Sequence, residues 1–215
     1  MKRWMFLAVG LVAVFPSICA ARGPLIANIS ILGAVIGPSK WNGDPWDGAG
    51  KRNPKAFKAI GKIVNAGNAS VPAVIKKVEK LAPTGRAPDV FGYVTTYGPT
   101  TTALSDTAAT RFTLATKHSA RRNTYHPRFN VSYDGWPVYK HTQFRIVLWD
   151  ADRSRNEAIG VVNISYADVK NAVAAGKPIW VNVYKRSQGQ IICIQIKASK
   201  APPNAVAKVD GDKYQ

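Results

Sequence analysis

The chain has 215 residues, the length of one domain with a full hydrophobic core. Its formal net charge is +18, with 30 Lys and Arg against 12 Asp and Glu, so its charge favours polyanionic partners such as anionic lipid, lipopolysaccharide or nucleic acid. The three histidines lack metal-ligand spacing, and Ser165 and Ser187 lack the glycines of a nucleophile elbow, so we predict a protein that is not an enzyme.

The N-terminus has the pattern of a secretory signal peptide over residues 1–21. Lys2 and Arg3 precede an apolar run that is too short to span a bilayer permanently, and small residues lead to a cleavage site after Ala21. We therefore expect a secreted or periplasmic protein, which makes nucleic acid an unlikely main partner. After cleavage Cys193 is the only cysteine, so no intrachain disulfide can form, and we expect a small buried hydrophobic residue there.

A strand is expected at Leu25–Ile36, which is apolar and β-branched with no polar face at helical spacing. Residues 37–50 then form a loop rich in Gly, Pro, Trp and Asp, with two turn signals. Two interpretations are open for Trp41 and Trp46 in this loop. They either pack back on the domain or anchor the loop in a membrane interface, where Trp is favoured.

Residues 54–81 show the apolar spacing of two amphipathic helices, interrupted at Gly67-Asn68 and basic on their outer faces. Pro72 fits the first turn of the second helix. This helical pair either covers part of the domain or forms a cationic element on a membrane surface.

The remaining chain is mostly short apolar strands separated by turns. Strands are expected at residues 89–97, 111–118, 128–131, 138–143, 144–150, 161–165, 179–184 and 190–198, with a loose polar loop at 100–109 and a helical or irregular connection at 167–175. About eight strands predict an all-β fold, an antiparallel β-sandwich with the helical pair inserted. We place the domain at residues 25–198 and a flexible tail at residues 199–215.

Residues 144–160 contain the most informative acidic pattern. Asp150 and Asp152 end a strand two positions apart, so their side chains are expected on one side of it. Two such carboxylates repel unless one is protonated or a cation lies between them, and a hard divalent ion prefers oxygen ligands of this kind. A solvated acidic turn is the alternative.

The sequence resembles C2 domains over residues 26–198. The resemblance is carried, in the order of that family, by the acidic loop at 42–48, Pro88-Asp89, the turn at 123–130, the strand and loop at 144–152 with Ile159-Gly160, and the closing strand at 189–191. It implies an eight-stranded C2-like β-sandwich with calcium-binding loops at one end and calcium-dependent attachment to phospholipid.

The resemblance also implies site residues. Asp89, Asp150 and Asp152 match calcium-ligand positions, Glu157 lies near the last one, and either Asp44 or Asp47 supplies the ligand of the first loop. The spacing between the first loop and Pro88-Asp89 is stretched by the helical insertion, and the third loop is one residue shorter than usual. The basic residues expected to form a phosphate-binding surface, or else a solvated basic face, are Lys117, Arg121, Arg122, Arg128 and Lys140.

Six of the 12 acidic residues fall in loops that this fold would bring together, and a cation would relieve their repulsion. The leading hypothesis is a calcium-binding module that attaches to anionic phospholipid or lipopolysaccharide, with Trp41 and Trp46 among its lipid contacts. The alternative is a calcium-independent protein-interaction or structural domain that binds a polyanionic partner.

Overall fold

The computed structural model describes residues 24–47, 51–65, 70–83, 85–97, 110–140, 142–153, 155–202, 204–205 and 208–210. The expected signal peptide and the expected polar loop at residues 100–109 lie outside the described residues. Within the described ranges, no helix is long and apolar enough to cross a membrane.

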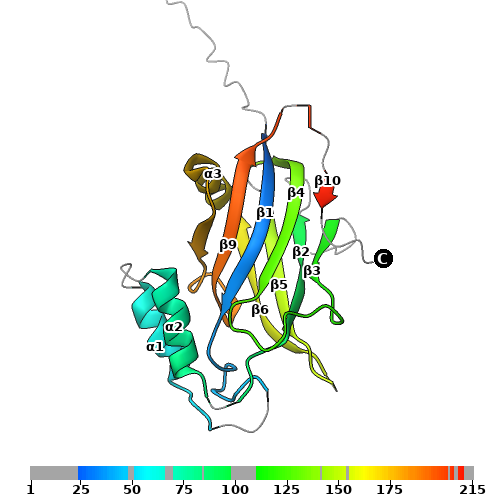
Figure 1. Cartoon of the computed structure of the whole chain (residues 1–215). Helices are drawn as coiled ribbons and strands as arrows, with labels where there is room; N and C mark the ends of the chain where they lie inside the picture. The colour runs from blue at the N-terminus through cyan, green and yellow to red at the C-terminus, as the bar shows by residue number, and fades with distance from the viewer. Residues whose placement is uncertain are drawn as a thin grey trace, which may run out of the picture.

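Two antiparallel sheets pack face to face (Figure 1). The first has the order β10-β4-β1-β9-β7, with β10 Lys208–Asp210, β4 Arg128–Val138, β1 Leu25–Ile36, β9 Ile191–Lys200 and β7 Ile179–Asn182. The second has the order β3-β2-β5-β6-β8, with β3 Thr110–Ala115, β2 Val90–Tyr97, β5 Gln143–Asp150, β6 Glu157–Ser165 and β8 Gln188–Gly189. Without the short strands β8 and β10, each sheet has four strands in the described part of the chain. This confirms the expected all-β fold, an antiparallel β-sandwich with eight main strands.

The alternation of side chains along β5 explains why an aspartate at the end of this strand is buried on the same side as the core residues. Phe144, Ile146 and Leu148 are fully buried between the sheets, and Asp150 follows them in the same alternation. The side chain of Asp150 therefore lies on the core side of the sheet with no exposed surface. The chain then leaves the sheet, so Asp152 lies in the loop beyond the core.

The structure corrects one expected break. Residues 128–131 and 138–143 were expected to form two strands, but β4 is continuous from Arg128 to Val138 and ends before a turn. The strand continues through this region because Gly135 lies in a β-bulge, which accommodates its positive φ without ending the strand. Gly135 has φ 63° and donates its backbone N–H to Asn28 Oδ1 at 2.8 Å, at a register shift against β1.

The helical pair consists of α1 Ala56–Asn65 and α2 Val71–Leu81, with a proline in the first turn of α2 as expected. Figure 1 shows both helices beside the lower part of β9. Their apolar faces bury Ile60, Val64, Val74 and Val78 in a second core, against side chains of the first sheet: Val35, Ile192 and Cys193. The insertion therefore covers the sandwich, and its apolar face is not free to enter a membrane. Cys193 is buried, as expected.

Gly61 lies where α1 packs closely against the segment that follows β7. A β-carbon at Gly61 would collide with the phenol of Tyr184, which stacks on Phe57 at 4.9 Å and donates its hydroxyl to the Phe57 carbonyl at 3.4 Å. We expect Gly61→Ala to lower the free energy of unfolding by about 1–3 kcal/mol through overpacking. In a free helix the same change stabilises by roughly 1 kcal/mol, so the sign of the shift in thermal denaturation is diagnostic.

The matched control is Gly61→Ala in a Tyr184→Ala background. There the added methyl group has room, and we expect no loss or a small gain in stability. Equal destabilisation in both backgrounds would contradict this account of how the insertion docks.

The connection after β6 is helical, with α3 running from Tyr166 to Ala175. Ser165 and Asp168 form a capping box at its start, and Gly176 ends it at φ 62°. At the C-terminus, β9 extends to Lys200 and Lys208–Asp210 pair with β4. Part of the segment expected to be a flexible tail is therefore paired in the sheet.

Candidate metal centre

Three carboxylates meet at the end of the sandwich where β5 ends. Oxygen atoms of Asp47, Asp150 and Asp152 all lie within 4.8 Å of one another. Asp150 is fully buried, whereas Asp47 and Asp152 are partly exposed. We call these three residues the acidic cluster. It opens toward solvent through its two loop residues and closes on the core through Asp150.

The helical insertion does not separate Asp47 from the rest of the cluster, because the chain returns to the point where it left. Asp47 and Arg86, on either side of the insertion, form an antiparallel bridge through both backbone N–H groups, at 3.3 and 3.0 Å. This bridge fixes Asp47 beside the start of β2. The helical insertion therefore lengthens the sequence between Asp47 and Asp89 without moving Asp47 away from Asp150 and Asp152.

Asp89 lies against the cluster without being one of its three residues. Its backbone N–H donates to Asp150 Oδ1 at 2.7 Å, and its own Oδ1 accepts the backbone N–H of Asn123 at 2.7 Å. Asn123 has φ 48°, a left-handed conformation that Asn tolerates, and its side-chain oxygen accepts the N–H of Ala87 at 2.8 Å. Asn123 thus holds the Pro88-Asp89 segment in place beside the cluster.

Burial and electrostatic repulsion act together on the carboxyl groups of the cluster. Burial, with the negative charges of the neighbouring aspartates and against the opposing hydrogen bond from the Asp89 N–H, raises the pKa of Asp150 to about 7. Burial also raises the pKa of Asp47 to about 6, together with the side chain and charge of Asp152. The pKa values of both carboxyl groups lie nearer to neutral than usual mainly because burial disfavours the charged form, and repulsion between the neighbouring carboxylates adds to this effect.

Asp150 also has an unused acceptor atom. One carboxylate oxygen accepts the N–H of Asp89, but Oδ2 is buried and has no hydrogen-bond partner among the described residues. A buried, ionisable oxygen without a partner is costly in a folded protein. A bound cation or a proton on Oδ2 would supply the partner that this oxygen lacks.

Two of the acidic residues expected at the site are engaged elsewhere. Asp44 accepts from the side chain of Asn42 and lies 3.6 Å from the guanidinium of Arg52, so Asp47 is the residue of this loop that reaches the cluster. Glu157 is opposite Asp150 in the β5–β6 register, but its carboxylate is paired with Lys40. The structure thus brings together Asp47, Asp150 and Asp152, with Asp89 adjacent, and leaves Asp44 and Glu157 outside.

The two tryptophans have different environments. Trp46 is only 3% exposed and donates its indole N–H to the carbonyl of Gly37 at 2.9 Å, so it packs back on the domain and is not available for lipid contact. Trp41 is 81% exposed at the same end. Of the two, Trp41 alone keeps the environment that a membrane anchor needs.

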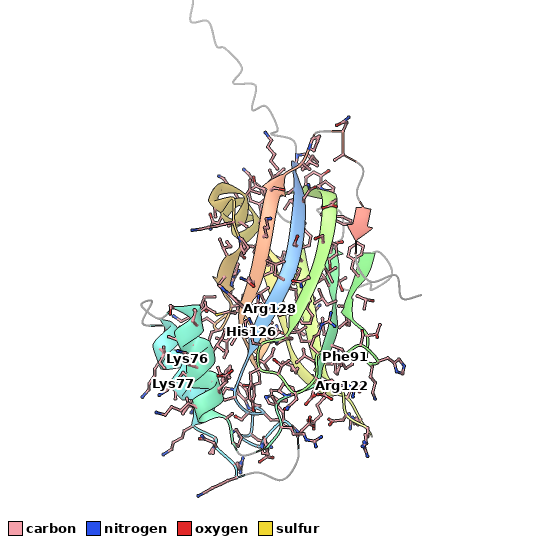
Figure 2. The ribbon with its side chains drawn as sticks, in the orientation of Figure 1. Lys76, Lys77, Phe91, Arg122, His126 and Arg128 are labelled. Atoms are coloured by element: carbon pink, nitrogen blue, oxygen red, sulfur yellow. The ribbon has the colours of Figure 1, made fainter. Side chains whose placement is uncertain are left out.

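The five basic residues expected to form one surface are spread over the molecule. Lys117 and Arg122 are exposed at the acidic end, where Figure 2 shows Arg122 beside Phe91. Arg121 lies there too, but its guanidinium donates to the carbonyl of Arg128 at 2.6 Å and closes a turn. These residues border the acidic cluster.

The other two basic residues lie away from that border. Arg128 is on the face of the first sheet and donates to Gln195 at 2.8 Å. Lys140 follows β4 and precedes β5, so it lies at the opposite end of the sandwich from Asp150 and is wrong as a member of the surface.

Lys40 was not singled out from the sequence, and Asn123 was noted only as the start of the turn at 123–130, although both shape the site. Lys40 pairs with Glu157, and its charge lowers the pKa of Asp47. A lysine in a loop gives no sequence signal for such a partner. Asn123 has a weak sequence signal, because Asn in a turn tolerates the left-handed backbone conformation that this position adopts.

No family model and no curated protein matches the sequence. Among solved structures, the chain is similar to a calcium-bound pair of C2 domains from extended synaptotagmin 2, with 12% identity over 81% of this chain and 46% of that one, at a TM-score of 0.41. A second structure of the same two domains has 14% identity over 95% and 51%, at 0.42. A single C2 domain of plant extended synaptotagmin 1 has 8% identity over 84% and 99%, at 0.38. The chain thus matches about half the length of the first two structures, and likenesses this distant carry no inference about individual residues.

Proposed function

We propose that this chain binds calcium at the acidic cluster and attaches, through the bound ion, to anionic phospholipid. The observation that carries the proposal is the Asp150 carboxylate, which is fully buried with Oδ2 unpartnered among the described residues, inside a group of three carboxylates. Neither a solvated acidic turn nor an ordinary salt bridge has this combination.

The donor set fits a hard divalent cation. Calcium takes six to eight oxygen ligands in a flexible arrangement, and Asp47, Asp150 and Asp152 supply carboxylate oxygens from three backbone positions. The remaining ligands would come from water, from nearby backbone carbonyls or from lipid phosphate. A bound calcium ion would neutralise the negative charges of these three carboxylates and so remove their mutual repulsion.

The surroundings of the cluster support attachment to an anionic surface. Trp41 is exposed at this end, and the exposed basic residues Lys117 and Arg122 lie at the same end. Basic side chains near an anionic surface attract it, and an indole is favoured in the interfacial layer. Export by the N-terminal signal belongs to the same proposal, because calcium outside the cytoplasm reaches the concentrations that weak sites need, about 0.1–1 mM.

The direct test is cosedimentation with vesicles of phosphatidylcholine, with and without phosphatidylserine, in calcium at about 1 mM or in a chelator. We expect binding only with both calcium and phosphatidylserine. Asp47→Asn should weaken it at least about tenfold, because one carboxylate ligand is lost.

Asp44→Asn is the matched control, because Asp44 belongs to the same loop but lies outside the cluster. This variant should bind as the native protein does. Vesicle binding that persists in the chelator and ignores both substitutions would instead support a calcium-independent domain with a polyanionic partner.

A further inference from the structure

The helical insertion turns a basic surface to solvent. Residues 51–83 contain eight Lys and Arg and a single acidic residue, Glu79. Both helices bury their apolar faces in the second core against the first sheet, so their opposite faces turn away from the sandwich. Six lysines lie on these outer faces or directly before α1, and none of them is in an ion pair among the described residues. The six are Lys55, Lys58, Lys62, Lys76, Lys77 and Lys80.

One end of this surface is fixed beside the acidic cluster. Asn53, which precedes α1, donates its side-chain N–H to the carbonyl of Leu81 at 3.1 Å, so the start of α1 and the end of α2 lie together. The backbone N–H of Asn53 donates to the carbonyl of Gly43 at 2.7 Å, and the bridge between Asp47 and Arg86 holds the returning chain. Figure 1 shows this end of the helical pair at the end of the sandwich where β5 and β6 are joined.

Four exposed basic residues gather at this end of the pair. Lys55 and Lys58 lie at the start of α1. Lys80 lies in the last turn of α2, and Arg86 follows the insertion. We call these four residues the basic end of the insertion. Lys62, in the last turn of α1, lies roughly 10 Å farther along the helix and is outside this group.

The packing of the insertion does not require positive charge at its basic end. The first turn of α1 has no acidic residue, and the dipole of a helix disfavours positive charge at its start, where Lys55 and Lys58 lie. These two lysines are three positions apart, so they also repel each other. Any polar residue could cover the outside of the helices, whereas an anionic partner would relieve both unfavourable effects.

The neighbouring loop favours a membrane as that partner. Trp41 is 81% exposed in the loop whose Gly43 carbonyl accepts the Asn53 N–H, and an indole is favoured at a membrane interface. A soluble polyanion offers no apolar layer for this indole. We propose that the basic end of the insertion is a second contact with the anionic phospholipid surface that the acidic cluster binds through calcium. This inference rests on the proposed function and adds the helical insertion to the membrane-facing surface.

The two contacts are expected to act together. At about 0.15 M ionic strength the field of an exposed charge is screened over about 8 Å, so the basic end acts only after the calcium loops have reached the membrane. Each lysine close to an anionic surface then raises the affinity about fivefold. The hydrogen bonds from Asn53 hold the basic end beside the first loop, so both contacts can form at once.

The test is cosedimentation of the mature chain with vesicles of phosphatidylcholine and phosphatidylserine, in calcium at about 1 mM and at about 0.15 M ionic strength. A variant that combines Lys55→Gln, Lys58→Gln and Lys80→Gln should bind these vesicles at least about tenfold more weakly. All three side chains are exposed, so its Tm should be nearly unchanged. The rise of Tm with calcium in the absence of vesicles should match that of the native chain.

The matched control removes the same charge elsewhere. It combines Lys62→Gln, Lys170→Gln and Lys177→Gln, which are exposed positions in the last turn of α1, in α3 and after α3. This control should bind vesicles nearly as the native chain does. Equal weakening by both variants would show that only the net charge matters and would overturn the proposal. Native-like binding by the first variant would also overturn it.

A second arm in a chelator, at about 0.01 M ionic strength, separates this proposal from the calcium proposal. Charges then act over about 30 Å, so the native chain should bind the phosphatidylserine vesicles without calcium, and the first variant should bind them more weakly than the control does. Equal binding by the two variants would overturn the role of the basic end, whatever calcium does. A difference between them without any response to calcium would overturn the calcium proposal alone.

Dextran sulfate tests the other kind of partner. If the first variant loses binding to this soluble polyanion and keeps its binding to vesicles, then the basic end recognises a soluble polyanion, and the membrane proposal is overturned.

Discussion

Replacing Asp150 by asparagine is expected to stabilise the cation-free protein and to remove its response to calcium. At pH 8 the native side chain is a buried carboxylate whose pKa is raised to about 7, so its ionisation opposes folding. Asparagine keeps the oxygen that accepts the N–H of Asp89 and removes the charge. We expect the cation-free variant to gain roughly 2–4 kcal/mol in the free energy of unfolding, measured by urea denaturation.

Calcium should stabilise the native protein and not this variant. An ion at the acidic cluster binds the folded state alone, so the midpoint of denaturation should rise with calcium concentration. Asp44→Asn is again the control, and it should keep the full calcium response without the gain in the chelator. If Asp150→Asn is less stable than the native chain without calcium, then the carboxylate has a partner that makes it favourable, and the cluster is not a cation site.

The sequence predicted some of this site because the relevant information is local. The alternation in β5 places Asp150 on the side of Phe144 and Ile146, and the two-residue spacing brings Asp152 next to it. Pro88-Asp89 could likewise be placed at the start of a strand. The alternation of the strand and the Pro88-Asp89 motif were therefore sufficient to predict where these residues lie.

The remaining residues depend on contacts between distant parts of the chain. The choice between Asp44 and Asp47 is decided by the bridge from Asp47 to Arg86 across the helical insertion, which no spacing rule predicts. Glu157 is diverted by Lys40, a partner far away in the sequence. Trp46 is buried because the carbonyl of Gly37 accepts its indole N–H.

Misplacement of Lys140 has a different cause. From the sequence, its charge and its position near the middle strands looked like those of Arg122. Strand β5 runs from one end of the sandwich to the other. Lys140 before this strand and Asp150 at its end therefore cannot share a site. Charge alone did not carry that information.

Stability of the cation-free protein is expected to fall as the pH rises from 5 to 8. The pKa values of Asp150 and Asp47 are raised to about 7 and about 6, above 3.8, the usual value for an aspartate in an unfolded chain. Their contribution is therefore present in full below about pH 4 and is lost as the pH rises through 6 and 7. We expect a loss on the order of 2–4 kcal/mol in the free energy of unfolding, mostly from Asp150, because solvent screens the partly exposed Asp47.

His126 works in the opposite direction over part of this range. Burial and the charge of Arg128 lower its pKa, so its contribution is lost as the pH falls. Comparing the protein with and without calcium at each pH removes this term, because His126 is present in both states. The stabilisation by calcium should then grow from pH 5 to pH 8, since protons compete with the ion for Asp150 and Asp47. A calcium effect that is constant over this range would place the bound ion away from these two carboxylates.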